Sequence, residues 1–419
     1  MFKKSIFVSV LALLFVSGTS VAVVYANAHD KEDRVPGQYI VVLKDSVVDS
    51  DLVGDALVEK HKGQKLFTYN KAVKGFAAVL PDAEVVELKK DPRVLFVSED
   101  RKVEIVARPS DVTVMAQSLP TGVNRINAEN KLNKGAGVHV AVIDTGIDLK
   151  HQDLNANIAG GKNCSTGRSY TDGNGHGTHV AGTIAALKND RGVVGVAPEA
   201  KLWSVRVLNN SGSGTWSSVI CGVDFVTSKA PANGGPITVA NMSLGGGGAS
   251  DNACGKDNND ALHYAICRSR DAGVTYVVAA GNEGVDTALS VPAAYDDAVI
   301  TVSALADSDG VAGGAGSATS YGADDTFASF SNFGSAVDIA APGVKIYSTW
   351  KGGGYATLNG TSMATPHVAG AAALYIAAHP GATWTAVRDA LVAAGEALGD
   401  GHTDPSGLHP EVLVRADTL

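Results

Sequence analysis

Four polar residues in distant stretches of the chain are of the types that together break acyl bonds. Asp144 ends the apolar run VHVAVID, His176 lies in the glycine-rich stretch DGNGHGTHVAGTIAAL, and Ser362 lies in LNGTSMATPHVAGAAAL. A serine hydroxyl is a poor nucleophile until an imidazole takes its proton, and the imidazole needs a carboxylate to fix its tautomer. Asn282 follows the apolar run VTYVVAAG and offers an amide donor to the oxyanion that would form. The set predicts nucleophilic acyl transfer.

Each of these residues alone has a plainer explanation. An Asp after a strand often caps a turn, and a lone His at a helix entry is usually structural. His179, three residues after His176, suggests a pair of metal ligands, but no Glu of the zincin pattern accompanies it, so we do not predict zinc. The prediction therefore depends on the four residues meeting at one place.

The segments between these residues indicate how they would meet. Apolar runs such as VHVAVID, ITVANMSL and VITVSALA alternate with helix-like segments such as HVAGTIAAL and WSSVICGVDFV. Uninterrupted apolar strands separated by helices favour a parallel sheet that is buried on both faces. We therefore predict an α/β fold, doubly wound, with a mostly parallel sheet and helices on both faces. Asp144 and Asn282 would lie at the carboxyl edge of this sheet, and Ser362 would open a helix beside it.

The N-terminal part of the chain has a different pattern. Residues 1–28 combine two lysines, an apolar run and Ala26-Asn27-Ala28, which is typical of a secretory signal peptide cut after Ala28. A retained membrane anchor is the alternative. Residues 36–106 show the order βαββαβ of a small α+β domain, and a polar, proline-containing linker follows.

The blocks AVIDTGID, HGTHVAGTIA, NMSLGG, AAGN and GTSMATPHVAG resemble the signature blocks of the subtilisin family (subtilases), in the family's order Asp, His, Ser. The resemblance extends from Ala116 to about Val414, and residues 36–106 resemble the family's inhibitory propeptide. This order of residues disfavours an α/β-hydrolase esterase and a chymotrypsin-like protease.

The resemblance implies a serine endopeptidase and gives each of the four residues a role. Ser362 would be the nucleophile, His176 the general base and then acid, Asp144 the orienting carboxylate, and Asn282 with the Ser362 amide the oxyanion hole. A serine esterase or acyltransferase without a strand-binding cleft is one competing interpretation. A binding-only pseudoprotease, which would not label with a serine-directed phosphonate, is the other.

The resemblance also implies where a substrate binds. The peptide would lie as an added β-strand between segments 212–214 and 243–245, with an apolar pocket for the fourth residue before the cut. The expected substrate-binding residues are Gly212, Ser213, Gly214, Trp216, Ser243, Leu244, Gly245, Ala279, Ala280 and Gly281. Plain core packing is the alternative for Trp216. No acidic residue occurs in the wall segments, so we predict broad cleavage after apolar or aromatic residues.

The stretch AQSLPTGVNRI resembles the mature start of bacterial subtilisins, which places the maturation cut after Met115. An earlier first cut near Ala107, with later trimming, is the alternative. The expected parts are a signal peptide at 1–28, an inhibitory propeptide at 29–115 and a peptidase domain at 116–419. We expect the propeptide to act as a folding template and as an intramolecular inhibitor.

The stretch LKNDRGVVGVAP resembles the family's calcium loop, and irregularly spaced oxygen ligands suit Ca²⁺. A solvated polar loop is the alternative. The resemblance implies a structural Ca²⁺ and no organic cofactor. The expected ligands are side-chain oxygens of Gln117, Asp153 and Asn189 and main-chain carbonyls of Leu187, Arg191 and Val193.

Charge and cysteines bear on the partners and the compartment. The chain's net charge of −9 lies entirely C-terminal to residue 115, which disfavours nucleic acid as a partner. Four cysteines downstream of an export signal favour disulfides, and the short loop favours Cys254 with Cys267, which leaves Cys164 with Cys221. Four buried free thiols are the alternative. We expect a secreted, extracellular monomer that acts on proteins and peptides and contacts no membrane once its signal is removed.

Overall fold

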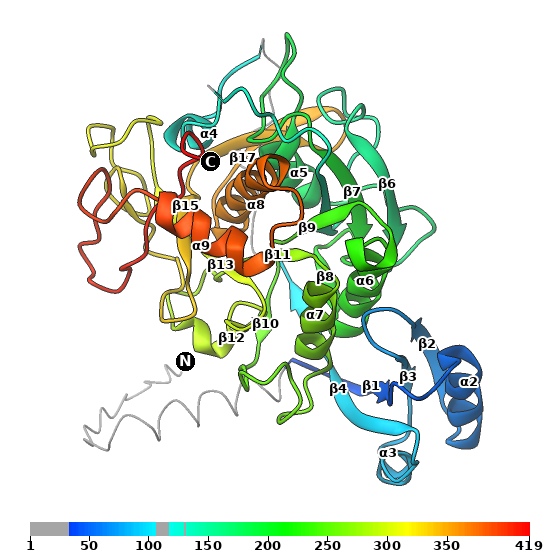
Figure 1. The fold of residues 1–419 in the computed structure, drawn as a ribbon. Coiled ribbons are helices and arrows are strands. Elements are labelled where there is room, and N and C mark those ends of the chain that lie inside the picture. The colour runs from blue at the N-terminus through cyan, green and yellow to red at the C-terminus, as the bar shows by residue number, and fades with distance from the viewer. Residues whose placement is uncertain (1–32, 106–116, 130) are drawn as a thin grey trace, which may run out of the picture.

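The computed structural model describes residues 33–105, 117–129 and 131–419 (Figure 1). The expected signal peptide, and the two cleavage positions expected after Met115 and near Ala107, lie outside the described residues. A small N-terminal part, blue to cyan in Figure 1, packs against the helices α6 and α7 of a larger part.

The N-terminal part has the predicted order βαββαβ. Its strands follow the spatial order β2-β3-β1-β4, and every neighbouring pair is antiparallel. Val41, Leu57, Phe76 and Leu88 lie in its core. The elements are β1 (Arg34–Leu43), α2 (Ser50–Lys60), β2 (Gln64–Tyr69), β3 (Gly75–Val79), α3 (Asp82–Leu88) and β4 (Val94–Glu104).

The larger part has the predicted α/β fold around an eight-stranded sheet. Its strands run parallel in the order β13-β11-β9-β5-β7-β6, while β15 pairs parallel and β14 antiparallel to β13. The strands are β5 (His139–Asp144), β6 (Ile158–Asn163), β7 (Lys201–Arg206), β9 (Ile237–Met242), β11 (Thr275–Ala279), β13 (Ile300–Ala306), β14 (Thr326–Phe327) and β15 (Ile339–Pro342). Smaller pairings involve β8 (Ser213–Thr215), β10 (Gly246–Gly247), β12 (Ser290–Val291), β16 (Ile346–Trp350) and β17 (Gly354–Leu358).

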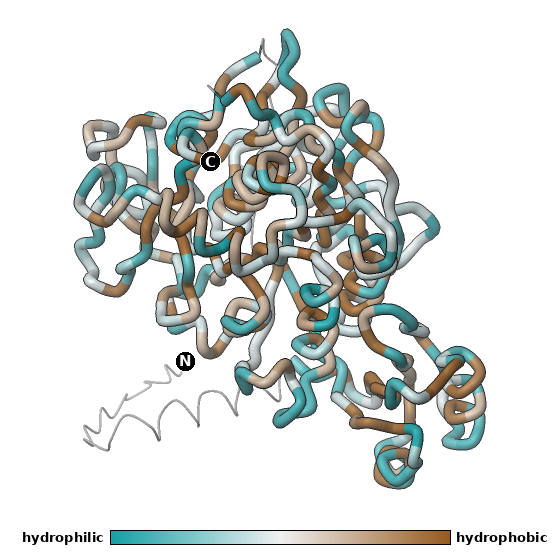
Figure 2. Tube along the Cα trace, viewed as in Figure 1, coloured by the Kyte–Doolittle hydropathy of each residue, from teal (hydrophilic) through white to brown (hydrophobic). Residues whose placement is uncertain are grey.

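Helices cover both faces of this sheet, as the apolar strands predict. Val140 and Val142 of β5 face one hydrophobic cluster, and Ala141 and Ile143 face the other. Figure 2 shows hydrophobic residues along the inner strands and helices and hydrophilic residues along the outer loops. The helices are α4 (Thr121–Arg125), α5 (His176–Ala185), α6 (Trp216–Ser228), η1 (Pro231–Asn233), α7 (Ala261–Asp271), η2 (Thr287–Leu289), α8 (Thr361–Ala378) and α9 (Trp384–Ala394).

Helix α8 passes through the middle of the larger part (Figure 1). Nearly all of its residues are buried, so its lack of a polar face reflects a core helix and not a membrane span. Pro366 has no N–H to donate to the carbonyl of Ser362, four residues earlier. The hydroxyl of Ser243 donates to that carbonyl at 2.9 Å instead, which ties the start of α8 to the segment after β9.

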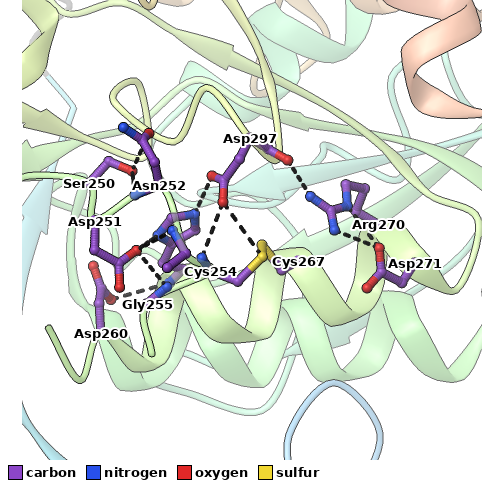
Figure 3. Close-up of a disulfide and its surroundings, with 12 residues drawn as sticks. Ser250, Asp251, Asn252, Cys254, Gly255, Asp260, Cys267, Arg270, Asp271 and Asp297 are labelled. Atoms are coloured by element: carbon purple, nitrogen blue, oxygen red, sulfur yellow. Dashed lines mark hydrogen bonds and ion pairs between the residues drawn. A yellow bond between two sulfur atoms is a disulfide. The ribbon is translucent and has the colours of Figure 1, made fainter. Parts of the chain in front are cut away.

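The cysteines form the two disulfides that the loop lengths favour. Cys164 pairs with Cys221, and Cys254 pairs with Cys267, so that pairing is confirmed. Figure 3 shows the second bond fastening the loop before α7 to that helix, with Asp297 beside it. In the part of the chain that the structure describes, no helix has the length and apolar character needed to cross a membrane.

Candidate active site

Asp144 and His176 form a buried pair. Asp144 ends β5 and His176 is the first residue of α5, so the strand edge and the helix start bring them together. The Nδ1 atom of His176 lies 2.9 Å from both carboxylate oxygens of Asp144, and the two side chains are at most 1% exposed. Nε2 of His176 makes no hydrogen bond with any described residue. A proton on Nδ1 therefore leaves the Nε2 lone pair free to accept one.

Ser362 lies in the first turn of α8, which packs against α5. Its hydroxyl donates to the carbonyl of Ser243 at 3.3 Å, and the residue is 4% exposed. The Ser243 hydroxyl in turn donates to the carbonyl of Ser362, so two hydrogen bonds hold Ser362 against the segment after β9. The described contacts of the Ser362 hydroxyl thus go to this segment, while the Nε2 of His176 remains without a partner among the described residues. Catalytic hydrogen bonds of this kind are often long before substrate binds.

The amide of Asn282 is oriented by the residue before Ser362. Its Oδ1 accepts from the N–H of Thr361 at 2.8 Å and from the Thr361 hydroxyl at 3.0 Å. These two bonds hold the oxygen toward the start of α8 and leave the NH₂ group as the remaining donor. Gly360, at φ 147°, provides the backbone turn that lets the helix begin against this amide.

A cavity of about 250 Å³ adjoins these groups. It is lined by Leu244 and Gly245, by Ala279, Ala280 and Gly281, and by Asn282 and Ser362. Glu283 also lines the cavity, and our sequence reasoning missed it although it follows Asn282 directly. Its carboxylate accepts from the Asn282 N–H and from the Asn332 amide, both at 2.9 Å, so two bonds already hold it.

The end of the N-terminal part lies in this cleft as an extra strand. β4 pairs antiparallel with β8, with Val103 opposite Gly214 and Glu104 opposite Ser213. On the other side, the N–H of Glu104 donates to the carbonyl of Gly245 at 3.4 Å. The two segments expected to hold a substrate therefore hold residues of this same chain. Val103 is buried in one cluster with Trp216 and Leu244.

The comparisons with known proteins agree with this geometry. Residues 135–406 match the model of the "Subtilase family", and residues 38–106 match "Peptidase inhibitor I9". The chain belongs to the subtilase family. It is 41% identical to Subtilisin E of Bacillus subtilis (strain 168) over 384 residues, which cover 88% of each protein. It is 42% identical to an Alkaline protease of Alkalihalobacillus alcalophilus over 336 residues, which cover 78% of this chain and 76% of that one.

A solved structure supports the same conclusion. The crystal structure of a cold adapted subtilisin-like serine proteinase aligns with a TM-score of 0.58 at 36% identity, over 71% of this chain and 97% of the other. This subtilase is a serine endopeptidase that carries an inhibitor domain on its N-terminal side.

In this subtilase, Asp172 organises the turn that carries the buried pair, and our sequence reasoning missed it. Its Oδ1 accepts from the Thr145 hydroxyl at 2.9 Å and from the N–H groups of Asn174 and Gly175 at 2.8 and 2.9 Å. Its Oδ2 accepts from the N–H and the hydroxyl of Thr178 at 3.0 and 2.6 Å. These bonds link the residue after Asp144 to the first turn of α5. The only sequence signal is an Asp four residues before the start of a helix, with two glycines between them.

His179 has a structural environment. Its Nε2 lies 3.0 and 3.1 Å from the carbonyls of Ile346 and Ala356 in the β16–β17 hairpin. Burial lowers the pKa of His179 to about 3, so the ring is neutral and donates one hydrogen there.

Four of the expected calcium ligands converge on the side chain of a fifth, Gln117. The side-chain nitrogen of Gln117 lies 3.0 to 3.3 Å from four oxygens, which belong to Leu187, Asn189, Arg191 and Val193. Asp153 lies beside them and accepts from the Asn189 amide at 2.8 Å. An amide nitrogen has only two hydrogens, so four converging acceptors exceed what it can satisfy.

Proposed function

We propose that this subtilase is exported as a precursor, cuts its own chain, and then hydrolyses proteins and peptides outside the cell. The expected parts remain a signal peptide at 1–28, a propeptide at 29–115 and a peptidase domain at 116–419. The observation that carries the proposal is the combination of the Asp144–His176 pair with a strand of the same chain in the adjoining cleft. The net charge of −9 favours partners other than nucleic acid, and the secreted enzyme is proposed to be a monomer.

The geometry supports the following division of roles. Nε2 of His176 takes the proton of Ser362 as the hydroxyl attacks the carbonyl carbon, and Asp144 stabilises the imidazolium through Nδ1. The NH₂ group of Asn282 and the N–H of Ser362 donate to the oxyanion. His176 then protonates the leaving amine, and water hydrolyses the acyl-enzyme by the same steps in reverse.

Strand β4 supports an inhibitory role for the propeptide and a first cut near Ala107. The N–H of Ile105 donates to the carbonyl of Gly212 at 3.1 Å, and Ile105 lines the same cavity as Ser362. The peptide bond to be cut then follows Ile105 closely in the sequence. Trimming to Ala116 would come afterwards.

The cavity supports a preference for apolar or aromatic residues before the cut. Ala279, Ala280 and Gly281 leave room for a large side chain, and Trp216 and Leu244 bury Val103 as they would a substrate residue. Both hydrogen bonds of Glu283 are accepted by its Oε2, so they fix the orientation of this carboxylate at the cavity wall, and the preference is expected from the apolar residues of the other wall segments. Cleavage of peptides with Phe or Leu before the cut should exceed cleavage after Lys at least tenfold.

The oxygens around Gln117 support a structural Ca²⁺. They are hard ligands from side chains and carbonyls, and turning the Gln117 amide end for end would present its oxygen to the same point. The ion would fasten the start of the peptidase domain to the loop after α5. It plays no part in bond cleavage, and no organic cofactor is required.

Expression of the wild-type chain beside Ser362→Ala tests the proposal. The wild type should shed its N-terminal part and digest casein, whereas Ser362→Ala should remain uncut and inactive. Ser317→Ala, at an exposed serine, is the matched control and should behave as the wild type. Self-cleavage or casein digestion by Ser362→Ala would refute the assignment. N-terminal sequencing of the shed products would decide between a first cut near Ala107 and one after Met115.

A further inference from the structure

A second group of oxygen ligands lies in the loop after β13, away from Gln117. Asp307, Asp309 and Asp324 each place one carboxylate oxygen within 4.8 Å of those of the other two. The loop is folded to hold them there. Asp307 accepts from the N–H of Gly310 at 2.8 Å, and Asp324 accepts from the N–H groups of Ser308 and Gly316, both at 2.7 Å.

Asp307 carries the observation that points to a ligand. Its side chain is fully buried, and its Oδ2 has no hydrogen-bond partner among the described residues. Burying a carboxylate oxygen removes it from water, which costs free energy unless a donor or a cation replaces the lost water. None of the described residues provides that donor to Oδ2 of Asp307.

The nearby cation does not supply the missing partner. Arg125 makes its ion pairs with other carboxylates, at 2.7 Å to Asp325 and at 2.6 Å to Glu396. The region around Asp307 thus holds more carboxylates than positive groups. A bound cation would correct this imbalance.

We infer that Asp307, Asp309 and Asp324 bind a Ca²⁺ ion. Carboxylates without sulfur or imidazole select a hard cation. Ca²⁺ binds oxygens at 2.3–2.6 Å, so oxygens on opposite sides of the ion are up to about 5 Å apart. Oxygens that all lie within 4.8 Å of one another can share an ion of this size. Mg²⁺ suits the group less well because it demands near-ideal octahedral geometry and gives up its water reluctantly.

The ion would hold a loop that the enzyme itself could attack. Residues 311–315 are exposed and rich in Gly and Ala, and the N–H groups of Gly313 and Gly314 bind the carboxylate of Asp325. Asp325 in turn pairs with Arg125 of α4, near the start of the peptidase domain. Ca²⁺ at Asp307 therefore orders the base of this loop and protects its exposed part from self-digestion.

Calorimetric titration of the full chain with CaCl₂, after removal of metal by chelator, tests the inference. The Ser362→Ala background prevents self-digestion. In that background, Asp309→Asn should bind one Ca²⁺ fewer than the parent, or bind it at least about tenfold more weakly, because affinity follows ligand charge. Asp309 is exposed, and an Asn oxygen can still accept from the Val311 N–H as the carboxylate does at 2.8 Å, so folding should persist.

Asp400→Asn, at an exposed Asp in another loop, is the matched control and should bind as the parent does. The test compares the Ca²⁺ stoichiometry and affinity of each variant with those of the parent. Any Ca²⁺ bound around Gln117 contributes equally to both and therefore does not affect the comparison. Asp309→Ala, which removes the oxygen altogether, provides a second variant with the same expectation. Equal stoichiometry and affinity in the parent and in both Asp309 variants would overturn the inference. Heat from MgCl₂ equal to that from CaCl₂ would overturn the choice of Ca²⁺.

Discussion

Replacing Asp172 by Asn tests whether the turn before α5 sets the rate of the reaction. The side chain keeps its size, and its Oδ1 can still accept from Thr145, Asn174 and Gly175. Oδ2, however, becomes an NH₂ group that faces the N–H and the hydroxyl of Thr178. Turning the amide the other way would set its NH₂ against three donors instead of two, so Asn cannot restore the network.

The expected size of the effect comes from the donors that lose their acceptor. The Thr178 hydroxyl can rotate, but its N–H cannot, so one or two of the five bonds are lost. A buried donor without a partner costs about 1–3 kcal/mol, which gives a local cost of about 1–4 kcal/mol. The lost bonds would loosen the link between Thr145, which follows Asp144, and Thr178, which lies two residues after His176. The variant should therefore shift Asp144 and His176 relative to each other. Because a shift of about 1 Å at a catalytic group can cost about 10² in rate, we expect kcat for Asp172→Asn to fall by about 10- to 100-fold.

The assay is hydrolysis of a chromogenic peptide after titration of active sites, so that only competent enzyme is counted. KM should change by less than about threefold because Asp172 does not line the cavity beside Ser362. Asp257→Asn, at an exposed Asp, is the control and should keep the parent's kcat. A kcat for Asp172→Asn within twofold of the parent, with all sites active, would refute a positioning role.

Three further predictions concern Arg125, His179 and Gly281. Arg125→Met should cost about 3–5 kcal/mol, seen as a melting temperature about 5–8 °C lower, because it removes the arginine that pairs with the buried carboxylates of Asp325 and Glu396. Arg415→Met, at a half-buried pair, should cost at most about 1 kcal/mol in the same calorimetric scan. Acid should destabilise the fold through His179: the unfolded ring takes a proton below about pH 6.5 and the folded ring does not, so about 2 kcal/mol is lost between pH 6.5 and 5, measurable as a lower denaturant midpoint. Gly281→Ala should lower kcat about tenfold or more, because φ is 110° and the new Cβ would lie 2.2 Å from the Asn332 amide, beside Asn282.

The fold was predictable where hydrophobic pattern decides it. Each apolar run named from the sequence, such as VHVAVID and VITVSALA, became a strand of the main sheet, within a residue or two at its ends. β6, with the sequence IAGGKN, has no apolar pattern and was not predicted. It forms a strand because its backbone pairs with the edge of β7. The β16–β17 hairpin was missed as well, since its strands pack against α5 from far along the chain. Tertiary contact, not local propensity, forms these elements.

The residues of the site that were predictable are those whose side chains have a direct chemical role in the proposed reaction. Asp144 ends β5, His176 and Ser362 lie at the starts of α5 and α8, and Asn282 follows β11 by three residues, and such positions can be recognised in a sequence. Asp172 and Glu283 bond to Thr145 and Asn332, which local pattern does not connect with them. Asp307 is brought close to Asp324 only by the folding of the loop. An Asp in a polar loop has the same local signal whether it holds a turn, a metal or only water. Only coordinates distinguish these roles.

The contacts of β4 determine what cleavage of the precursor can achieve. Cutting the chain beyond Ile105 leaves the pairing of β4 with β8 unchanged. It also leaves the carboxylate of Asp100 bound to the N–H and the hydroxyl of Ser217 at the start of α6. Three N–H groups at residues 70–72 remain bound to Asp224 at the other end of that helix. Since none of these contacts needs the cut bond, we expect inhibition to outlast the proposed cut. Proteolytic activity should therefore appear later than the cut that separates the N-terminal part from the chain. It should rise only as the separated N-terminal part is itself digested.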